Sequence, residues 1–439
     1  MPQIDLLLHA EWIVTVDADN RVLTDHCIAI DSGKIVAILP SSESDTKYQA
    51  SDTRYFPNQL LMPGLINSHT HAAMNLLRGI ADDLPLMEWL QEHIWPVEQK
   101  WLSAEFVRAG SQLAIAEMLR SGTTCFNDMY LFPDETARVA VEMGIRASIG
   151  LIVIDFPTVW ANDANEYISK GLHVHDQLHS EDLITTCFAP HAPYTVADEA
   201  LSKLQILAEE LDIPLHIHIH ETAREIRDTE SKRQPRPLER LNSLGYLSPR
   251  LMAVHMTQLI DEEIQTLATN GSHVIHCPES NMKLASGVCP VQKLLDAGVN
   301  IALGTDGAAS NNDLDMFGEM RSAALLSKVH TGDASSLNAT TALRMATING
   351  AKALGIDATT GSLEVGKAAD IIALQLDTLE TRPMYEVISQ IIYACGRQHV
   401  TDVWVAGLQR LQAGELVGVD EVSLLKTAKD WQNRIQDAL

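Results

Sequence analysis

The sequence predicts an α/β fold: a (β/α)8 barrel of the TIM type with a small β-sandwich accessory domain built from both chain termini. Three observations predict it. The chain has 439 residues, which suits a large barrel with an accessory domain better than an ordinary single domain. Eight apolar strand-like runs alternate with helical patterns in its middle, as in consecutive βα units. Short strand-like segments occupy both ends, where they can pair into one accessory sheet.

The terminal segments are short, apolar and separated by turn residues such as Asp17-Ala-Asp-Asn and Asp31-Ser-Gly. We predict accessory strands over residues 6–16, 27–30, 34–39, 368–376 and 400–405. An amphipathic helical pattern covers residues 421–439. The expected accessory domain therefore has two pieces that flank the barrel.

These patterns set the expected domain boundaries. Residues 1–61 form the first part of the accessory domain and residues 62–360 form the barrel. Residues 361–439 form the second part of the accessory domain together with the C-terminal helix.

The eight barrel runs are each followed by polar loop residues and then by a helical stretch. They end near His71, Tyr130, Val153, Pro190, His220, His255, His276 and Gly304. The stretch 103–120 is a clear helix, with Ser103 as its N-cap and Ser121-Gly122 at its end. Functional residues of such a barrel are expected where the strands end.

The first of these strand ends carries His69 and His71 in Pro63-Gly-Leu-Ile-Asn-Ser-His-Thr-His. Two histidines one residue apart on a strand point the same way, as a chelating pair must. The apolar run over residues 59–66 predicts a buried strand leading into the pair. Such a motif is weak alone, so the other strand ends must support it.

Strand five contains His216, His218 and His220, whose alternation directs all three imidazoles to one face. One of them can be a ligand, and a structural role is favoured for His216 and His220. His255 ends strand six, and Asp306 follows strand eight. A carboxylate after so apolar a strand is costly to bury unpaired, and a metal would explain it.

Imidazole and carboxylate ligands without a thiolate suit Zn²⁺ or another borderline divalent ion. A bound ion would lower the pKa of a water molecule to roughly 7. His255 and Asp306 are placed to take a proton from that water, and Glu221, just past strand five, can act as the acid.

Composition narrows the function classes. The formal net charge of −26 argues against nucleic-acid binding, because a phosphate backbone would be repelled. No window approaches a membrane span, and Met1-Pro-Gln-Ile-Asp5 lacks the features of a signal peptide. The six cysteines form no CxxC motif, so we expect a reduced, cytoplasmic protein.

Four motifs together resemble the amidohydrolase superfamily. They are the segment from Pro63 to His71, His218-Ile-His-Glu221, Ala253-Val-His255 and Leu303-Gly-Thr-Asp306-Gly-Ala-Ala-Ser-Asn-Asn. More narrowly, they look like the methylthioadenosine/S-adenosylhomocysteine deaminases, since the Ser-Asn-Asn tail of the last motif is specific to that branch. The similarity runs from the N-terminal β segment through the C-terminal one.

The resemblance implies roles for individual residues. His69, His71, His218 and Asp306 would bind one zinc ion, with His218 chosen because the family pattern is His-x-x-Glu. Glu221 would contact and protonate the purine ring, and His255 would orient or deprotonate the attacking water with help from Asp306, which also faces the substrate.

His191, in Ala189-Pro-His-Ala-Pro-Tyr194, resembles the family's nucleoside-binding histidine, and Glu98 resembles its acceptor for ribose hydroxyls. Without the resemblance, Glu98 would be an ordinary surface carboxylate and His191 a turn residue. For His276 the sequence favours neither a supporting role at the site nor a place in the core.

The loop after strand three indicates the substrate. Relatives that favour S-adenosylhomocysteine use arginines there for its carboxylate, whereas nothing basic lies between Arg146 and Lys170 here. The loop over residues 154–160 is apolar and aromatic, which suits a methylthio group. We expect 5′-methylthioadenosine to be preferred, with adenosine and S-adenosylhomocysteine weaker. The loop over residues 72–102, with Trp89 and Trp95, is expected to cover the sugar.

Two alternatives stay open. Another ring deaminase or hydrolase of the superfamily, acting on guanine, a pterin or a triazine, would share the metal ligands but not Glu98 or His191. A non-catalytic scaffold would have lost ligands, and all four are present. We also expect a homo-oligomer, because barrels with an accessory sheet often associate.

Overall fold

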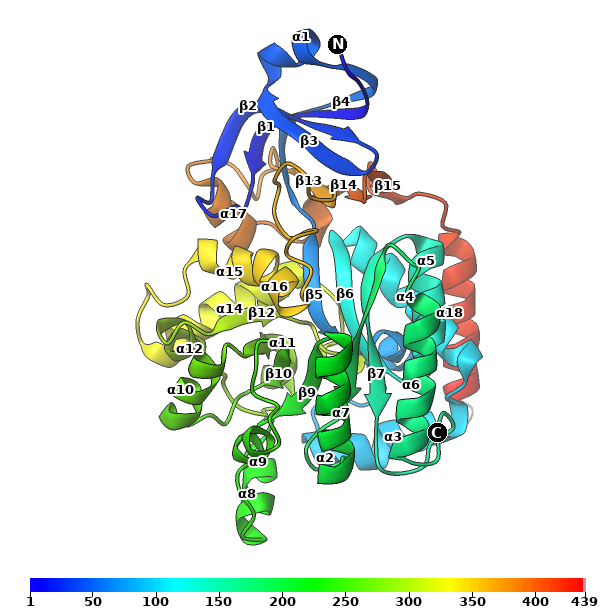
Figure 1. Ribbon diagram of the computed structural model, residues 1–439. Helices are drawn as coiled ribbons and strands as arrows, with labels where there is room; N and C mark the ends of the chain where they lie inside the picture. The colour runs from blue at the N-terminus through cyan, green and yellow to red at the C-terminus, as the bar shows by residue number, and fades with distance from the viewer. Residues whose placement is uncertain (437–439) are drawn as a thin grey trace.

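The chain folds into a (β/α)8 barrel and a smaller sheet domain built from both termini, as the sequence predicts (Figure 1). The structure is a computed structural model that describes residues 1–436. The sheet domain lies at the amino end of the barrel strands, and the carboxyl ends of the strands point away from it (Figure 1). The two ends of the barrel therefore face different surroundings.

Eight parallel strands form the barrel in chain order. They are β5 (Leu65–Thr70), β6 (Thr123–Tyr130), β7 (Arg146–Val153), β8 (Ile184–Pro190), β9 (Leu215–Ile219), β10 (Leu251–His255), β11 (His273–His276) and β12 (Asn300–Leu303). Each predicted strand end lies within one residue of the observed end. The prediction was accurate because parallel strands covered on both faces are apolar throughout; every residue of β6 and β7 is buried.

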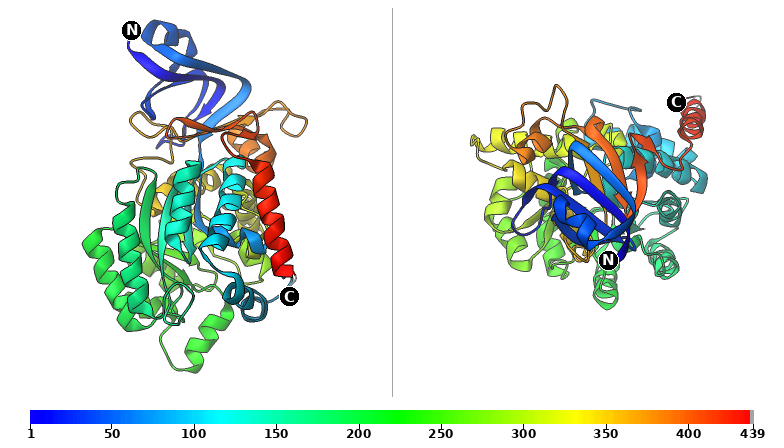
Figure 2. Two further views of the ribbon diagram at one scale, coloured as in Figure 1. Left: turned by 90° about the vertical axis from the view of Figure 1, so that its right-hand side faces the viewer. Right: turned by 90° about the horizontal axis from the view of Figure 1, so that it is seen from above.

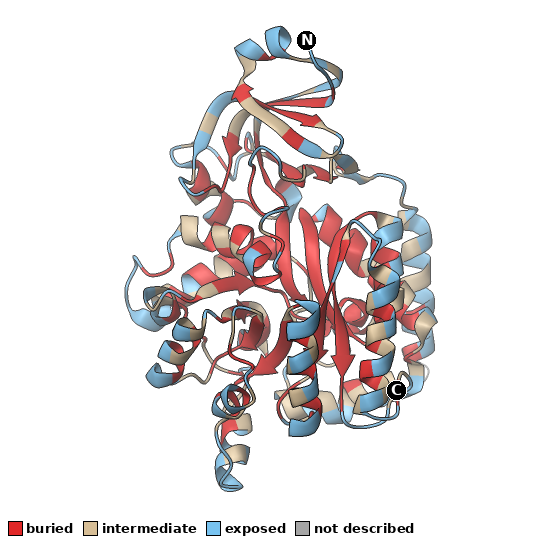
Figure 3. Cartoon of the chain, viewed as in Figure 1, coloured by how far each residue is buried: buried red, intermediate tan, exposed pale blue. Residues whose placement is uncertain are grey.

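Helices cover the outside of the barrel and keep their polar faces in solvent (Figure 3). The longer ones are α4 (Ala104–Arg120), α5 (Pro133–Met143), α6 (Ala164–Leu178), α7 (Asp198–Leu211), α8 (Ala223–Ser231), α10 (Asp261–Asn270) and α14 (Met316–Thr331). The shorter ones are α9 (Pro237–Ser243), α11 (Pro278–Lys283), α12 (Val291–Asp296), α13 (Ala308–Asn311), α15 (Ala339–Met345), α16 (Ile348–Ala353) and α17 (Val387–Tyr393). Ser103 caps α4 as predicted, since its hydroxyl accepts a hydrogen bond from the Phe106 amide.

The barrel closes between β12 and β5 through side chains rather than through a regular ladder. The Asn67 carboxamide accepts from the Thr305 amide at 3.0 Å and donates to the Thr305 hydroxyl at 2.7 Å. Gly304 makes this approach possible, because a Cβ there would lie 2.7 Å from the His69 nitrogen. The closure brings the segment after β12 directly against His69.

The accessory domain is one continuous eight-stranded mixed sheet in the order β16-β15-β14-β13-β4-β1-β2-β3. The strands are β1 (Gln3–Val14), β2 (Val22–Asp31), β3 (Lys34–Pro40), β4 (Gln49–Pro63), β13 (Ile371–Gln375), β14 (Val400–Val405), β15 (Leu408–Gln412) and β16 (Glu415–Leu416). The sheet folds over a shared apolar core, in which Leu8 and Ile30 join Ile371 and Trp404. An isolated bridge between Lys34 and Ala368 also links the two halves.

The apolar run over residues 59–66 is not one barrel strand, contrary to the sequence interpretation. Its first part ends β4 in the accessory sheet at Pro63, and its second part begins β5 at Leu65. Gly64 joins them in a space where a Cβ would lie 2.1 Å from the Thr124 hydroxyl. The last four residues of β4 and all of β5 are buried, so the composition of the run alone does not reveal the break.

The C-terminal helix α18 (Glu421–Gln436) lies along α4 on the barrel (Figures 1 and 2). Trp431 packs edge-on against Phe106 and Trp101, and Arg434 forms an ion pair with Glu105. The last three residues of the predicted helix, 437–439, lie outside the described residues. Within the described chain, no helix is both long and apolar enough to cross a membrane.

Candidate active site

Four histidines and an aspartate converge at the carboxyl end of the barrel. His69 and His71 come from the end of β5, His218 from β9, His255 from β10, and Asp306 follows β12. The Nε2 atoms of His69 and His218 are 3.2 Å apart. Asp306 Oδ1 lies 3.3 Å from His69 Nε2 and 3.2 Å from His71 Nε2. These atoms fall into two overlapping groups with the spacing of metal ligands.

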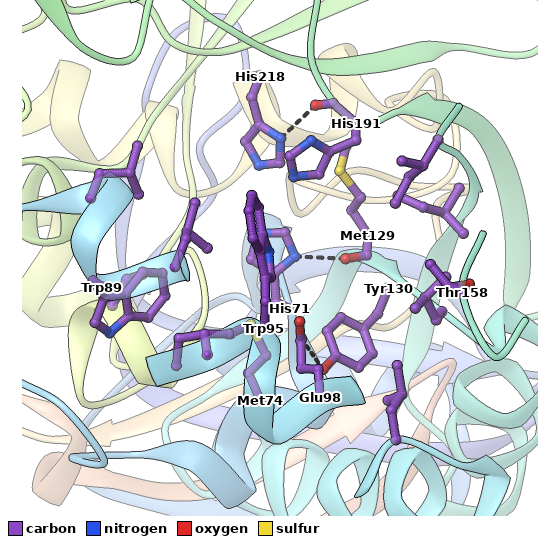
Figure 4. Close-up of a pocket in the computed structure, with 18 of the residues that line it drawn as sticks. His71, Met74, Trp89, Trp95, Glu98, Met129, Tyr130, Thr158, His191 and His218 are labelled. Carbon is purple, nitrogen blue, oxygen red and sulfur yellow. Dashed lines mark hydrogen bonds between the residues drawn. The ribbon is translucent and has the colours of Figure 1, made fainter. Parts of the chain in front are cut away.

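Hydrogen bonds on the far side of two rings determine which nitrogens face the centre. His71 Nδ1 donates to the Met129 carbonyl at 2.6 Å, and His218 Nδ1 donates to the His191 carbonyl at 2.7 Å (Figure 4). A neutral imidazole has one N–H, so each Nε2 directs a lone pair to the cluster. This arrangement is typical of histidines that hold a divalent metal ion.

Of the other strand-five histidines, only His216 reaches this cluster. Its Nε2 lies 3.0 Å from His69 Nδ1, and its Nδ1 accepts from the Asn127 carboxamide. His220 does not share the face of His216 and His218, contrary to the prediction. The strand ends at Ile219, and the positive φ of His220 turns its ring toward Glu263 and the Leu238 amide.

Asp306 is held from several sides. The Ser280 hydroxyl donates to Oδ2 at 2.6 Å, and the Gly307 amide donates to Oδ1 at 2.9 Å. Asp306 is therefore an anion available as a ligand.

Glu221 and His255 stand beside the ligand cluster, with Glu221 Oε2 and His255 Nε2 3.9 Å apart. Burial, with the charge of Asp306, raises the pKa of Glu221 to about 8, so this carboxyl carries a proton at neutral pH. His255 Nδ1 donates to Asn281 Oδ1 at 2.9 Å, which leaves its Nε2 free to accept a proton. Burial also lowers the pKa of His255.

Three of the residues at these strand ends have left-handed backbone conformations. The φ angles are +54° at His220, +75° at His255 and +63° at Asp306. Each costs about 1–3 kcal/mol for a residue with a side chain, and such strain concentrates at functional sites. These backbone conformations turn the chain sharply where the strands end.

A cavity of about 720 Å³ opens beside the cluster. The loop after β5 covers it with four short elements, η2 (Ala72–Leu77), α2 (Leu86–Glu88), η3 (Trp89–Ile94) and α3 (Trp95–Trp101). Trp89 and Trp95 of this loop line the cavity, where the prediction expected them to cover a sugar. Figure 4 shows His191 and His218 on one side of the cavity and Glu98 and Tyr130 on the other.

Glu98 is not a surface carboxylate, because it lines the cavity and accepts a 2.5 Å hydrogen bond from the Tyr130 hydroxyl. Burial raises its pKa, although this hydrogen bond opposes the shift. His191 also lines the cavity, and its Nδ1 lies 3.1 Å from the Thr195 hydroxyl. Burial lowers the pKa of His191 to about 4, so its ring is neutral.

The remaining wall is apolar and includes Ile154, Phe156 and Val159 from the loop after β7. Among the described residues, no lysine or arginine lines this cavity. His276, left open by the sequence, is buried beneath the site and does not line the cavity either.

Sequence reasoning missed Tyr130, Ser280 and Asn281 as site residues. Tyr130 was recognised only as a strand end, although that position itself directs a side chain to the site. Ser280 and Asn281 follow β11 in Pro278-Glu-Ser-Asn. Polar residues after a buried strand were a usable signal there.

Comparisons with known proteins agree with this geometry. Residues 60–410 match the model of the Amidohydrolase family. The chain is 50% identical over 433 residues to a 5-methylthioadenosine/S-adenosylhomocysteine deaminase of Saccharophagus degradans, covering 98% of this chain and 97% of that protein.

Two solved structures are also similar. The crystal structure of an adenosine deaminase from Xanthomonas campestris with bound zinc has a TM-score of 0.98 and 51% identity, covering 99% of both chains. A guanine deaminase from E. coli has a TM-score of 0.82 at 22% identity, covering 92% of this chain and 99% of that one, and shares the fold.

Proposed function

The chain belongs to the amidohydrolase family, and from that premise we propose that it catalyses the hydrolytic deamination of an adenine nucleoside, with 5′-methylthioadenosine as the preferred substrate. The observation that carries this proposal is the position of Glu221, a buried carboxyl that lines a nucleoside-sized cavity beside a cluster of metal-binding side chains. The products are 5′-methylthioinosine and ammonia.

We assign one zinc ion per chain to His69, His71, His218 and Asp306. The donor set fits, because the outer nitrogens of His71 and His218 are bonded to carbonyls and their inner nitrogens face the cluster. His71 Nε2 lies 3.2 Å from Asp306 Oδ1, and His218 Nε2 lies 3.2 Å from His69 Nε2. When bound, the ion supplies Lewis-acid activation of water. His216 and Ser280 hold His69 and Asp306 in place.

The nucleoside binds through its sugar and its base. Glu98, oriented by Tyr130, accepts hydrogen bonds from ribose hydroxyls, and His191 receives a further hydroxyl through Nε2, since its Nδ1 is directed to Thr195. Trp95 covers the sugar. The purine then has its C6 amino group at the metal cluster and its N1 at Glu221.

Deamination replaces the C6–N bond by a C6–O bond. A water oxygen attacks C6 while His255 Nε2, with Asp306, takes one water proton, and Glu221 donates its proton to N1. The remaining hydroxyl proton passes to the amino group, which leaves as ammonia. The proton held by His255 returns to Glu221, 3.9 Å away, and restores the starting state.

The apolar wall around Phe156 and Val159 suits a 5′-methylthio group, and no lysine or arginine of residues 1–436 lines the cavity to hold a carboxylate. Adenosine and S-adenosylhomocysteine are therefore weaker substrates in this proposal. Loss of adenine absorbance across a panel of 5′-methylthioadenosine, adenosine, S-adenosylhomocysteine, guanine, a pterin and a triazine tests it. Activity on the ring compounds without activity on the nucleosides would refute it.

We further propose a cytoplasmic location and a homo-oligomeric state. The six cysteines are buried and form no disulfide, as in proteins of reducing compartments. Sizing of the purified protein by light scattering checks the oligomer, and a monomer at cellular concentration would contradict it.

A further inference from the structure

A second cavity, of about 830 Å³, adjoins the substrate cavity. The two share Leu86, Phe156, Tyr194 and Glu221 as lining residues. Most of the rest of the second cavity is formed by the loop after β8 and by α8 and α9, with Met87 and Asp155 completing it. The helices α8 and α9 project from the barrel end farthest from the accessory sheet (Figure 1). A ligand that extends past Phe156 and Tyr194 therefore enters it directly.

The polar lining distinguishes this cavity from the first. It contains three cations, Arg224, Lys232 and Arg240, whereas the substrate cavity has none among the described residues. Arg240 is fully used, because it pairs with Asp198 at 2.7 Å and donates to the carbonyls of Pro193 and Val196. It is not free for a ligand.

Arg224 is free to bind an anion. Its only ion pair within residues 1–436 is with Asp228, where Nε and Oδ2 are 3.7 Å apart. The two side chains are 57% and 60% exposed, and exposed pairs of this kind contribute little free energy. A carboxylate that offered two oxygens to the guanidinium would compete well with Asp228.

Acceptors for an ammonium group lie beside this arginine. Glu225 Oε2 accepts from the Glu221 amide at 2.9 Å, but Glu225 Oε1 has no hydrogen-bond partner in the described part of the chain. Asp228 also lines the cavity and would be released by the departure of Arg224. One turn of α8 thus presents a cation and two carboxyl groups together.

We propose that the second cavity binds the amino-acid tail of S-adenosylhomocysteine, with Arg224 pairing with the α-carboxylate, the Asp228 carboxylate pairing with the α-ammonium, and Glu225 Oε1 accepting a hydrogen bond from that ammonium. The inference rests on the proposed function, because it requires the nucleoside to sit in the first cavity with its 5′ end at Phe156. Recognition by α8 replaces the arginines that the loop after β7 lacks. The tail is therefore accepted, by a contact that a methylthio group does not make.

The test compares kcat/KM for S-adenosylhomocysteine and 5′-methylthioadenosine in three proteins. Arg224→Ala removes the proposed partner, and Arg227→Ala is the matched control, since Arg227 is an exposed arginine of the same helix that lines neither cavity. We expect Arg224→Ala to lower the value for S-adenosylhomocysteine about tenfold, the size of one hydrogen-bonded charge contact. The value for 5′-methylthioadenosine stays at the wild-type level, as do both values in Arg227→Ala, and Arg224→Lys restores part of the loss.

The inference would be overturned if Arg224→Ala left the ratio of the two kcat/KM values unchanged, whether both values stayed at the wild-type level or both fell equally. Wild-type turnover of 5′-methylthioadenosine without any turnover of S-adenosylhomocysteine would also overturn it, while leaving the proposed function intact. Turnover of neither substrate by the zinc-loaded enzyme would refute the proposed function and the inference with it.

Discussion

The two ends of the barrel both bury charged side chains, but they satisfy them differently. At the amino end, Arg146 of β7 forms two hydrogen bonds with Asp370 of the accessory domain, and the Ala406 amide donates to the same carboxylate. At the carboxyl end, the imidazole lone pairs of His71 and His218 face the cluster, where Asp306 Oδ1 lies 3.2 Å from His71 Nε2. Charges buried for structure are paired within the protein, whereas this cluster has the donor set for which we propose a metal ion.

Among the changes that distinguish the two ends of the barrel, metal removal should have the largest effect on activity. A chelator should abolish deamination and lower the unfolding temperature, because a bound ion stabilises the folded state by mass action. Added Zn²⁺ should restore both. Metal analysis, activity and thermal unfolding of the same sample check this, and full activity in a metal-free sample would contradict the assignment of the cluster.

Asn281→Ala should reduce kcat by about 10- to 100-fold, as loss of a residue that orients a catalytic ring commonly does. Asn281 Oδ1 accepts a hydrogen bond from His255 Nδ1. Without Asn281, the His255 proton can move to Nε2, and Nε2 then no longer accepts a proton from water. KM should change little, because Asn281 does not line the cavity. A loss confined to KM would contradict this role.

The pH dependence should reflect Glu221. Burial raises its pKa to about 8, and the carboxyl must be protonated to donate to N1. Activity is therefore present below this pKa and falls about tenfold per pH unit as the pH rises above it. A pH profile of kcat on 5′-methylthioadenosine measures the alkaline limb, and rising activity through pH 9 would contradict the assignment.

Asp370→Asn tests the other end of the barrel and should have the smallest effect on catalysis. It leaves the Arg146 guanidinium without its buried counter-ion, which costs about 3–5 kcal/mol in the free energy of unfolding. Denaturant unfolding measures that loss, while kcat and metal content should stay near the wild-type values. A loss of metal without a loss of stability would break the distinction between the two ends.

Local patterns in the sequence predicted the barrel and the positions of five clustered residues, whereas their roles and the choice of Glu98 and His191 came from the family resemblance. Apolar runs end one residue or less from each observed strand end, and the barrel rule brings His69, His71, His218, His255 and Asp306 to one face. His220 was misplaced because its left-handed φ depends on contacts with Glu263 and Leu238 from other segments.

Other features depend on packing that no local pattern encodes. The break at Gly64 separates the buried end of β4 from the buried strand β5. The helix α18 lies on the barrel through Trp431 rather than on the accessory sheet. The hydrogen bond from Tyr130 to Glu98 joins β6 to α3. The cavity at Arg224 is lined by the loops after β5, β7, β8 and β9, which lie far apart in the sequence.

The central claim is that Glu221 is the acid of a metal-dependent nucleoside deaminase, and Glu221→Gln tests it most directly. The substitution keeps the shape of the side chain but removes the proton that Glu221 donates, and it leaves the four metal ligands untouched. Metal content and turnover of 5′-methylthioadenosine should be measured on the same preparation. The account predicts full zinc with kcat reduced by about 10³-fold; normal turnover by the zinc-loaded variant would contradict it.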